Sequence, residues 1–360
     1  MKPRIVSVVS GKGGSGKTLF TAVLGRTLAE EGLRVLLVDM DIFVRGLTVL
    51  LHRFRKTSTG IGTSTISDLL GIFERESQRR GPVDGSNLAL IRFGEADVAP
   101  AVSDVSAPLD YDDTALSEER FCYERIQSLI DQVGSRYDYI VLDNRAGMDS
   151  LVAASCRSAS FVLSIAEDDD VGRQTNVNLV NFLRFKKDIS RIYTVINKGR
   201  RIRDFRDVER RKEERAEFSV LGVIPFDSDV MDTFGSERFW VAVNETLYFR
   251  ALIEAWNALP ADAGGKEITL SRYRFPPRIF MQKSQGRFTL IERMLRLYSV
   301  LFIFAGLSAW FYPKFLRGSL DQYDLIAMVS IAVGVVSLVL STVGLKYFFF
   351  PGTSERHDER

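Results

Sequence analysis

In VVSGKGGSGKTLF, residues 8–20, an apolar run, a glycine-rich loop and a helical pattern follow one another, which is typical of a strand, a loop and a helix. The loop matches the pattern G-x-x-x-x-G-K-[ST] at four positions, Gly11, Gly16, Lys17 and Thr18. Small residues there let backbone N–H groups surround phosphate oxygens at the start of a helix. The sequence therefore predicts a phosphate-binding loop. The pattern requires one lysine, and the loop carries a second, Lys12.

Further apolar runs follow along the chain, with helical patterns between them. Together with the first run they predict six strands, near residues 4–9, 34–38, 138–143, 160–165, 191–197 and 219–224. Strands that alternate with helices form a parallel sheet with helices on both faces. We therefore predict an α/β fold, a doubly wound and mostly parallel sheet of the P-loop NTPase class. Its ligand site lies at the carboxyl ends of the strands.

The charge balance and the cysteine content argue against several classes of function. The chain has 48 lysines and arginines against 46 aspartates and glutamates, a formal net charge of +2, so no overall field favours nucleic acid as a partner. It has two histidines, and its two cysteines, Cys122 and Cys156, lack metal-ligand spacing. We expect neither a zinc site nor a histidine-based triad, but two buried thiols in a reducing compartment.

Two apolar segments after the α/β region predict a membrane hairpin. Residues 325–345 carry no charge and, as a helix, measure about 31 Å, the thickness of a bilayer core. Residues 297–312 are also uncharged but measure only about 24 Å, so a re-entrant or interfacial segment is the alternative there. The predicted parts are an α/β domain at 1–262, a basic linker at 263–296, two transmembrane helices at 297–350 and a tail at 351–360.

The basic residues of the linker predict the orientation of this hairpin. Positive charge before the first segment keeps the flanking domain in the cytoplasm, and two crossings return the tail to the same side. We therefore expect a multi-pass protein of the inner (cytoplasmic) membrane, with the large domain facing the cytoplasm.

The fuller loop KGGSGKT, residues 12–18, closely resembles the deviant Walker A motif of the MinD/ParA family of ATPases. The resemblance implies ATP and Mg²⁺ as ligands, with Lys17 on the β- and γ-phosphates and the Thr18 hydroxyl on the metal. It also accounts for Lys12. In that family the early lysine reaches across a face-to-face homodimer to the partner's nucleotide, so that hydrolysis depends on ATP-dependent dimerisation.

Two more strand ends resemble the switch segments of the family. RVLLVDMD ends in Asp39 and Asp41 and resembles switch I, whose second aspartate orients the attacking water. YDYIVLDNRAG resembles the Walker B and switch II segment, with Asp143 in the Mg²⁺ shell and the Gly147 N–H on the γ-phosphate. The implied catalytic residues are Lys12, Lys17 and Asp41. The implied metal residues are Thr18, Asp41 and Asp143.

The last motifs concern the dimer interface and the base. FVLSIAEDDDV resembles a strand and loop that carry an acidic residue near the interface, with Asp170 as the best match. IYTVINK ends in Asn197, the adenine-contacting asparagine of the family, and LGVIPFDSDV carries the Pro225–Asp227 loop beside the base. The alternatives of a turn residue for Asn197 and a helix cap for Asp227 stay open. The implied nucleotide-binding residues are Gly11, Gly13, Gly14, Ser15, Gly16, Lys17, Thr18, Gly147, Asn197, Pro225 and Asp227.

Two positions depart from the family pattern. Arg145 stands where relatives commonly have proline, and Gly46 where they commonly have asparagine or serine. Arg145 has two interpretations, a cation for the phosphates or a side chain that faces solvent or an interface. The mixed charge run at 199–218 also has two, a solvated face or a surface for a partner or lipid.

These features together predict a membrane-tethered ATPase switch that binds Mg-ATP, dimerises face to face and controls a protein partner at the membrane. A catalytically weak ATP-binding membrane adaptor is one alternative. A tyrosine-kinase-like bacterial regulator of polysaccharide export is another, although no tyrosine cluster ends this chain. A chromosome- or plasmid-partitioning ATPase is the third, and the membrane hairpin argues against it.

Overall fold

The computed structural model describes residues 2–52, 64–71, 84–103, 105, 117–199 and 219–273. They belong to one compact unit that runs from Met1 to Phe275. The predicted membrane hairpin and tail, and the charge run beyond Gly199, lie outside the described residues. Within the described ranges, no helix combines the length and the hydropathy needed to cross a membrane. The hairpin therefore stays a prediction.

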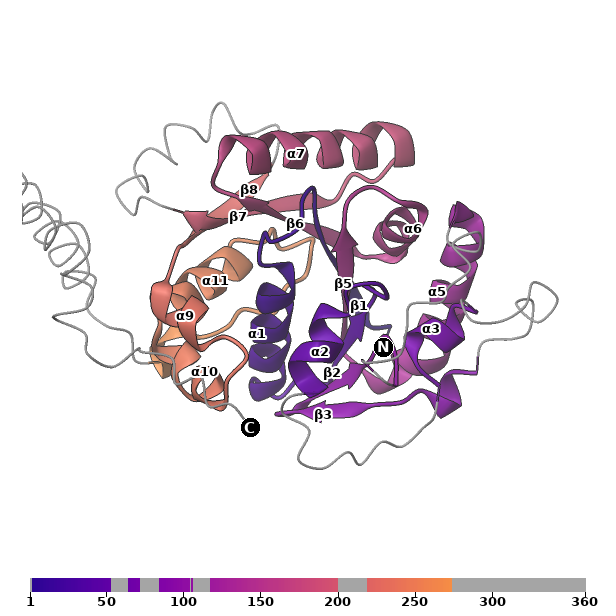
Figure 1. Cartoon of the computed structure of the whole chain (residues 1–360), viewed down its shortest axis with the longest axis horizontal. Helices are drawn as coiled ribbons and strands as arrows, with labels where there is room; N and C mark the ends of the chain where they lie inside the picture. Colours follow the sequence, from indigo (N-terminus) through magenta and orange to yellow (C-terminus); the bar gives the residue numbers. More distant parts are fainter. Residues whose placement is uncertain are drawn as a thin grey trace, which may run out of the picture. The chain divides into compact units, whose positions relative to one another are not determined.

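An eight-stranded sheet forms the centre of the unit (Figure 1). The strand order is β3-β4-β2-β5-β1-β6-β7-β8, and all neighbours are parallel except β3 and β4. Six strands match the predicted runs, namely β1 (Arg4–Ser10), β2 (Val35–Asp39), β5 (Tyr139–Ala146), β6 (Phe161–Glu167), β7 (Ile192–Gly199) and β8 (Val220–Pro225). The predicted mostly parallel α/β sheet is therefore confirmed.

The sequence pattern misses two short strands at one edge of the sheet, β3 (Ile91–Phe93) and β4 (Ala96–Ala99). They form an antiparallel hairpin, and β4 pairs with β2. Three or four residues are too few to show a strand period, which is why these strands are found only in the structure.

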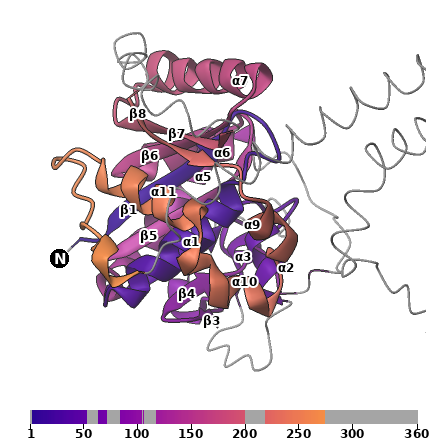
Figure 2. The same cartoon turned by 90° about the vertical axis from the view of Figure 1, so that its left-hand side faces the viewer.

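Helices cover both faces of the sheet, and α7 and α11 lie on opposite sides of β6 and β7 (Figures 1 and 2). One face carries α1 (Lys17–Glu30), α2 (Gly46–His52), α9 (Ser228–Thr233), α10 (Glu237–Ala242) and α11 (Leu247–Asn257). The other carries α3 (Ile66–Leu69), α5 (Glu119–Val133), α6 (Ser150–Ser158) and α7 (Asp170–Asn181). Because apolar cores form on both faces, the central strands are buried almost throughout, as parallel strands in such sheets are.

The chain continues to pack on α11 beyond residue 262. The Trp256 indole N–H donates to the Lys266 carbonyl (2.9 Å), and Asn257 exchanges hydrogen bonds with the backbone of Ile268. Ile268 itself is buried in the core. The compact unit therefore includes the first residues of the predicted linker, and the domain boundary at 262 stays a prediction.

The carboxyl ends of the parallel strands gather the predicted site segments at one edge of the sheet. The strand order reverses at β1, which lies between β5 and β6. Doubly wound sheets bind ligands at such a switch point. The phosphate loop follows β1 there, and the segments that carry Asp41, Asn197 and Asp227 come from the ends of β2, β7 and β8.

Candidate functional site

A cavity of about 380 Å³ opens at this edge of the sheet. The phosphate loop forms one wall from Gly13 to Thr18, and Asp41 and Gly46 lie on the side of β2. The opposite wall comes from the ends of β7 and β8 and from α9, with Asn197, Lys198, Pro225, Phe226, Asp227 and Met231. The fold thus brings together residues from four distant parts of the chain, and most of the predicted nucleotide-binding residues are among them.

Two glycines of the loop have positions that no larger residue could take. Gly16 has a φ of 88° and is the N-cap of α1, and a Cβ there would lie 2.3 Å from the Asn197 side-chain nitrogen. A Cβ on Gly11 would lie 2.3 Å from the Thr175 carbonyl oxygen of α7. The loop therefore lies tightly between β7 and α7, and Gly11 and Gly16 are the positions where this close packing requires glycine. The next residue after Gly16, Lys17, is 7 % exposed and lines the cavity.

The carboxylates below the loop have the character of a magnesium site. Asp39 is buried at the end of β2 and Asp143 within β5, and burial raises the pKa of Asp39 to about 8 and that of Asp143 to about 6. The charge of Asp143 also raises the pKa of Asp39. Asp143 Oδ1 accepts from the Thr21 hydroxyl (3.1 Å), whereas Oδ2 is buried without a hydrogen-bond partner among the described residues.

A divalent cation fits this environment. It would offset the repulsion between the buried carboxylates and satisfy Asp143 Oδ2, directly or through water. Within the described ranges, no three acidic, histidine or cysteine side chains are grouped to hold a metal ion. Mg²⁺ is commonly held by one or two carboxylates together with water and substrate phosphates, and Thr18, Asp41 and Asp143 are the residues that would hold it here.

Asp39 also holds the segment that carries Asp41. Its carboxylate accepts from the Thr48 backbone N–H (2.8 Å) and hydroxyl (2.6 Å), and from the Asp41 N–H (3.1 Å). The Thr48 hydroxyl in turn accepts from the Ala101 N–H (2.8 Å). Sequence reasoning chose Asp41 and missed Thr48, because nothing in the sequence pairs Thr48 with a strand end nine residues earlier.

Gly46 lies against Thr18 in the structure. A Cβ at this position would lie 3.1 Å from the Thr18 hydroxyl oxygen, closer than most Cβ contacts. The departure from the family pattern at Gly46 therefore leaves room around one of the implied metal residues. 

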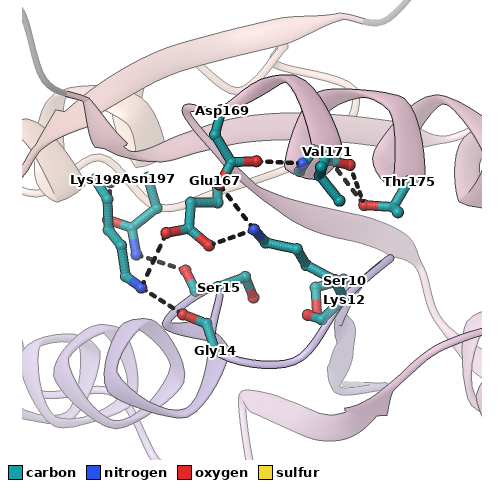
Figure 3. A network of polar contacts seen from close by, with 11 residues as sticks. Ser10, Lys12, Gly14, Ser15, Glu167, Asp169, Val171, Thr175, Asn197 and Lys198 are labelled. Atoms are coloured by element: carbon teal, nitrogen blue, oxygen red, sulfur yellow. Dashed lines mark hydrogen bonds and ion pairs between the residues drawn. The ribbon is translucent and has the colours of Figure 1, made fainter.

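Lys12 does not line the cavity; instead its ammonium lies between two carboxylates of the same chain (Figure 3). Its Nζ is 2.8 Å from Glu167 Oε2 and 2.8 Å from Asp169 Oδ2. The hydrogen bonds to Asp169 and Glu167 raise the pKa of Lys12. Lys198 Nζ reaches the other oxygen of Glu167 (3.2 Å) and donates to the Gly14 carbonyl (2.6 Å).

The acidic partners of Lys12 are neighbours of Asp170, whose place near the dimer interface stays a prediction. Asp170 is exposed in the first turn of α7, whereas Glu167 and Asp169 face the loop. The run EDDD at the end of a predicted parallel strand indicates that an acidic residue lies near the loop. Which of its four acids contacts Lys12 depends on the geometry of the strand end and is seen only in the structure.

The base side of the cavity shows other uses for the residues predicted there. The Asn197 amide donates to the Ser15 carbonyl (2.8 Å) and so holds the phosphate loop. Asp227 caps α9 by accepting from the backbone of Asp229 and Val230, which is the helix-cap alternative. Both residues still line the cavity. The Gly147 N–H donates to the Ser10 carbonyl (3.0 Å) in this structure, and Gly147 lies outside the cavity wall.

The sequence matches a known family over most of the described unit. The family described as "CobQ/CobB/MinD/ParA nucleotide binding domain" matches residues 6–238.

Curated relatives agree with this match. Septum site-determining protein MinD of Synechocystis sp. is 28% identical over 198 residues, which are 50% of this chain and 65% of that protein. The chloroplastic minD homolog of Arabidopsis thaliana is 27% identical over 239 residues, 64% of this chain and 66% of that protein. Antiactivator FleN of Pseudomonas aeruginosa is 24% identical over 278 residues, 73% of this chain and 90% of that protein. The chain thus spans just under two thirds of the length of both MinD relatives.

Solved structures share the fold. The MinD cell division protein of Aquifex aeolicus has a TM-score of 0.53 at 21% identity, over 74% of this chain and 99% of that one. MinD of Pyrococcus horikoshii OT3, solved with Mg-ADP, has a TM-score of 0.52 at 23% identity, over 74% of this chain and 100% of that one. At these identities the likeness concerns the fold alone.

Proposed function

Because the chain belongs to the CobQ/CobB/MinD/ParA nucleotide-binding family, we propose that it is an ATPase switch that binds Mg-ATP and pairs face to face with a second copy. In this proposal the pairing controls a protein partner at the membrane. One observation carries it: the two lysines of the phosphate loop have separate positions. Lys17 lines the nucleotide cavity, whereas Lys12 lies outside it, between Glu167 and Asp169.

The chain's own residues divide the work within the cavity. Lys17 would neutralise the β- and γ-phosphates, and the backbone N–H groups around Gly16 would bind their oxygens. Bound Mg²⁺ would neutralise charge on the phosphates, with Thr18, Asp41 and Asp143 as its protein residues. Asp41 would also orient water for attack, held in place by Asp39.

Lys12 would supply a further cation, and it would supply it to the partner's nucleotide. To reach that nucleotide, Lys12 has to leave Glu167 and Asp169. Dimerisation would therefore replace the two carboxylate contacts of its ammonium with a contact to a phosphate of the partner's nucleotide. Hydrolysis would therefore depend on dimerisation, because each site is completed by the other subunit.

The partner and the membrane belong to the same proposal. Relatives by name include a septum site-determining protein and an antiactivator, and one solved relative is a MinC:MinD complex of Aquifex aeolicus. The two uncharged segments at 297–312 and 325–345 support a permanent tether, so that ATP would control pairing in the membrane plane. Extraction by alkaline carbonate without detergent would refute the tether, and a reporter fused after Arg360 should report the cytoplasm.

The test of the switch mixes two inactive full-length variants, Lys12→Ala and Asp41→Ala, reconstituted in lipid. With random pairing half of the dimers are mixed, and each mixed dimer has one complete site. ATP turnover should recover to about a quarter of the wild-type rate, provided that the two sites work independently.

The matched control mixes Lys17→Ala with Asp41→Ala. Both residues serve the nucleotide of their own subunit, so this mixture contains no complete site and should stay inactive. Normal turnover by Lys12→Ala alone would refute the trans role of Lys12. Tight ATP binding without turnover by the wild type, with lipid present, would instead favour the catalytically weak adaptor.

A further inference from the structure

Arg145 lies at the junction of two cavities. One is the nucleotide cavity, and the second, of about 450 Å³, is lined by residues that include Met148, Ser150 and Lys187. Arg145 and Phe43 line both. The pair thus forms part of the partition between the nucleotide cavity and the second one.

A bulge in β5 gives Arg145 this direction. Between Asp143 and Ala146, β5 has two residues where its neighbour β1 has one. Bulges of this kind re-aim side chains next to active sites. The Asn144 amide turns toward β1 and donates to the Val8 carbonyl (3.0 Å), whereas Arg145 turns to the cavity wall.

The contacts of Arg145 join two segments that surround the site. Its guanidinium carbon lies 4.4 Å from the centre of the Phe43 ring, and Phe43 belongs to the segment that carries Asp41. Its Nε lies 3.2 Å from Asp149 Oδ2, and Asp149 caps α6. The side chain is 37% exposed, so a ligand in the cavity has access to it.

The chemistry of this arrangement fits a phosphate. A guanidinium has five N–H donors in a planar fork that matches phosphate oxygens, and Nε is the nitrogen that lies 3.2 Å from Asp149. We infer that Arg145 donates hydrogen bonds to the terminal phosphate of a nucleoside triphosphate bound in the same chain. The inference rests on the proposed ATP-binding function. It makes Arg145 the residue by which this chain distinguishes triphosphate from diphosphate.

The Phe43 contact gives this recognition a consequence. When the Arg145 guanidinium moves toward the terminal phosphate, the Phe43 ring that it contacts moves with it. Phe43 belongs to the segment that carries Asp41, so this segment moves as well. A nucleoside diphosphate lacks the third phosphate, so Arg145 would keep its ion pair with Asp149 when a diphosphate is bound.

The experiment measures equilibrium binding of a non-hydrolysable ATP analogue and of ADP, with Mg²⁺, to the full-length protein. Arg145→Ala should weaken binding of the analogue about tenfold or more, the effect of losing charge-assisted hydrogen bonds, and change ADP binding less than about twofold. Arg145→Lys keeps the charge without the fork and should fall between Arg145→Ala and the wild type.

The matched control is Arg26→Ala. Arg26 also lies over an aromatic ring, that of Trp240 (5.6 Å), and also pairs with an acid four residues away, Glu30, but it does not line the cavity. Its loss should leave both affinities unchanged. Equal weakening of analogue and ADP by Arg145→Ala, or no weakening, overturns the inference and gives Arg145 a structural or partner-facing role. If the wild type binds neither nucleotide while it stays folded, the proposed function itself fails.

Discussion

Thr48→Val should lower the free energy of unfolding by about 2–4 kcal/mol, although the two side chains have nearly the same shape. Thr48 is 2% exposed. Its hydroxyl donates to Asp39 (2.6 Å) and accepts from the Ala101 N–H (2.8 Å). Valine leaves that buried N–H without a partner, which costs about 1–3 kcal/mol, and removes one hydrogen bond of the Asp39 carboxyl group, worth about 1 kcal/mol more.

The chain offers a matched control in Thr194→Val. Thr194 is also 2% exposed, but its hydroxyl has no hydrogen-bond partner among the described residues. The same replacement there removes an unsatisfied polar atom, so stability should stay within about 0.5 kcal/mol of the wild type or rise.

Thermal unfolding followed by tryptophan fluorescence compares the two variants. For a domain of this size about 1 kcal/mol shifts the Tm by about 2–4 °C, so Thr48→Val should melt roughly 4–16 °C below the wild type and Thr194→Val close to it. Urea titration of the same samples would give the free energies directly. Two variants that unfold within about 1 kcal/mol of each other would refute the claim that the Thr48 hydrogen bonds stabilise the segment with Asp41.

Three further predictions follow from single contacts. Glu167→Gln should let ATP-bound dimers form at lower protein concentration, because Lys12 then has to break one ion pair instead of two to reach the partner subunit. Unchanged association in analytical sedimentation would count against the proposed movement of Lys12. Burial raises the pKa of the Cys156 thiol to about 12, and only the thiolate reacts with alkylating reagents. Alkylation of Cys156 at pH 8 should therefore be about a thousandfold slower than that of an ordinary cysteine, and its rate should rise tenfold per pH unit. Rapid labelling of the native protein, measured by mass spectrometry, would contradict this prediction. Gly11→Ala should lower the Tm and abolish ATP binding, because its Cβ would lie 2.3 Å from a carbonyl of α7, whereas Gly13→Ala meets nothing within 4 Å and should melt like the wild type.

The sequence determines the elements and the chemistry of the loop. Short apolar runs, such as VLLV in β2 and YIVL in β5, mark the central strands because parallel strands are buried on both faces. Such a run can be recognised without knowing which strands lie beside it. The phosphate loop is equally local, since its glycines, Lys17 and Thr18 lie within eight residues and are predicted to bind one ligand. The short strands β3 and β4 escape such reasoning because their pairing, not their composition, makes them strands.

The tertiary structure decides which of these side chains meet. The position of β1 between β5 and β6 brings the phosphate loop beside Glu167 and Asp169, some 155 residues away, and this gives Lys12 its partners. The end of β7 likewise brings Asn197 onto the Ser15 carbonyl, and the bulge in β5 turns Arg145 toward Phe43. Strand order and register depend on packing summed over the whole sheet, whereas each sequence motif reports only its own few residues, so contacts between strand ends appear only once the sheet is assembled.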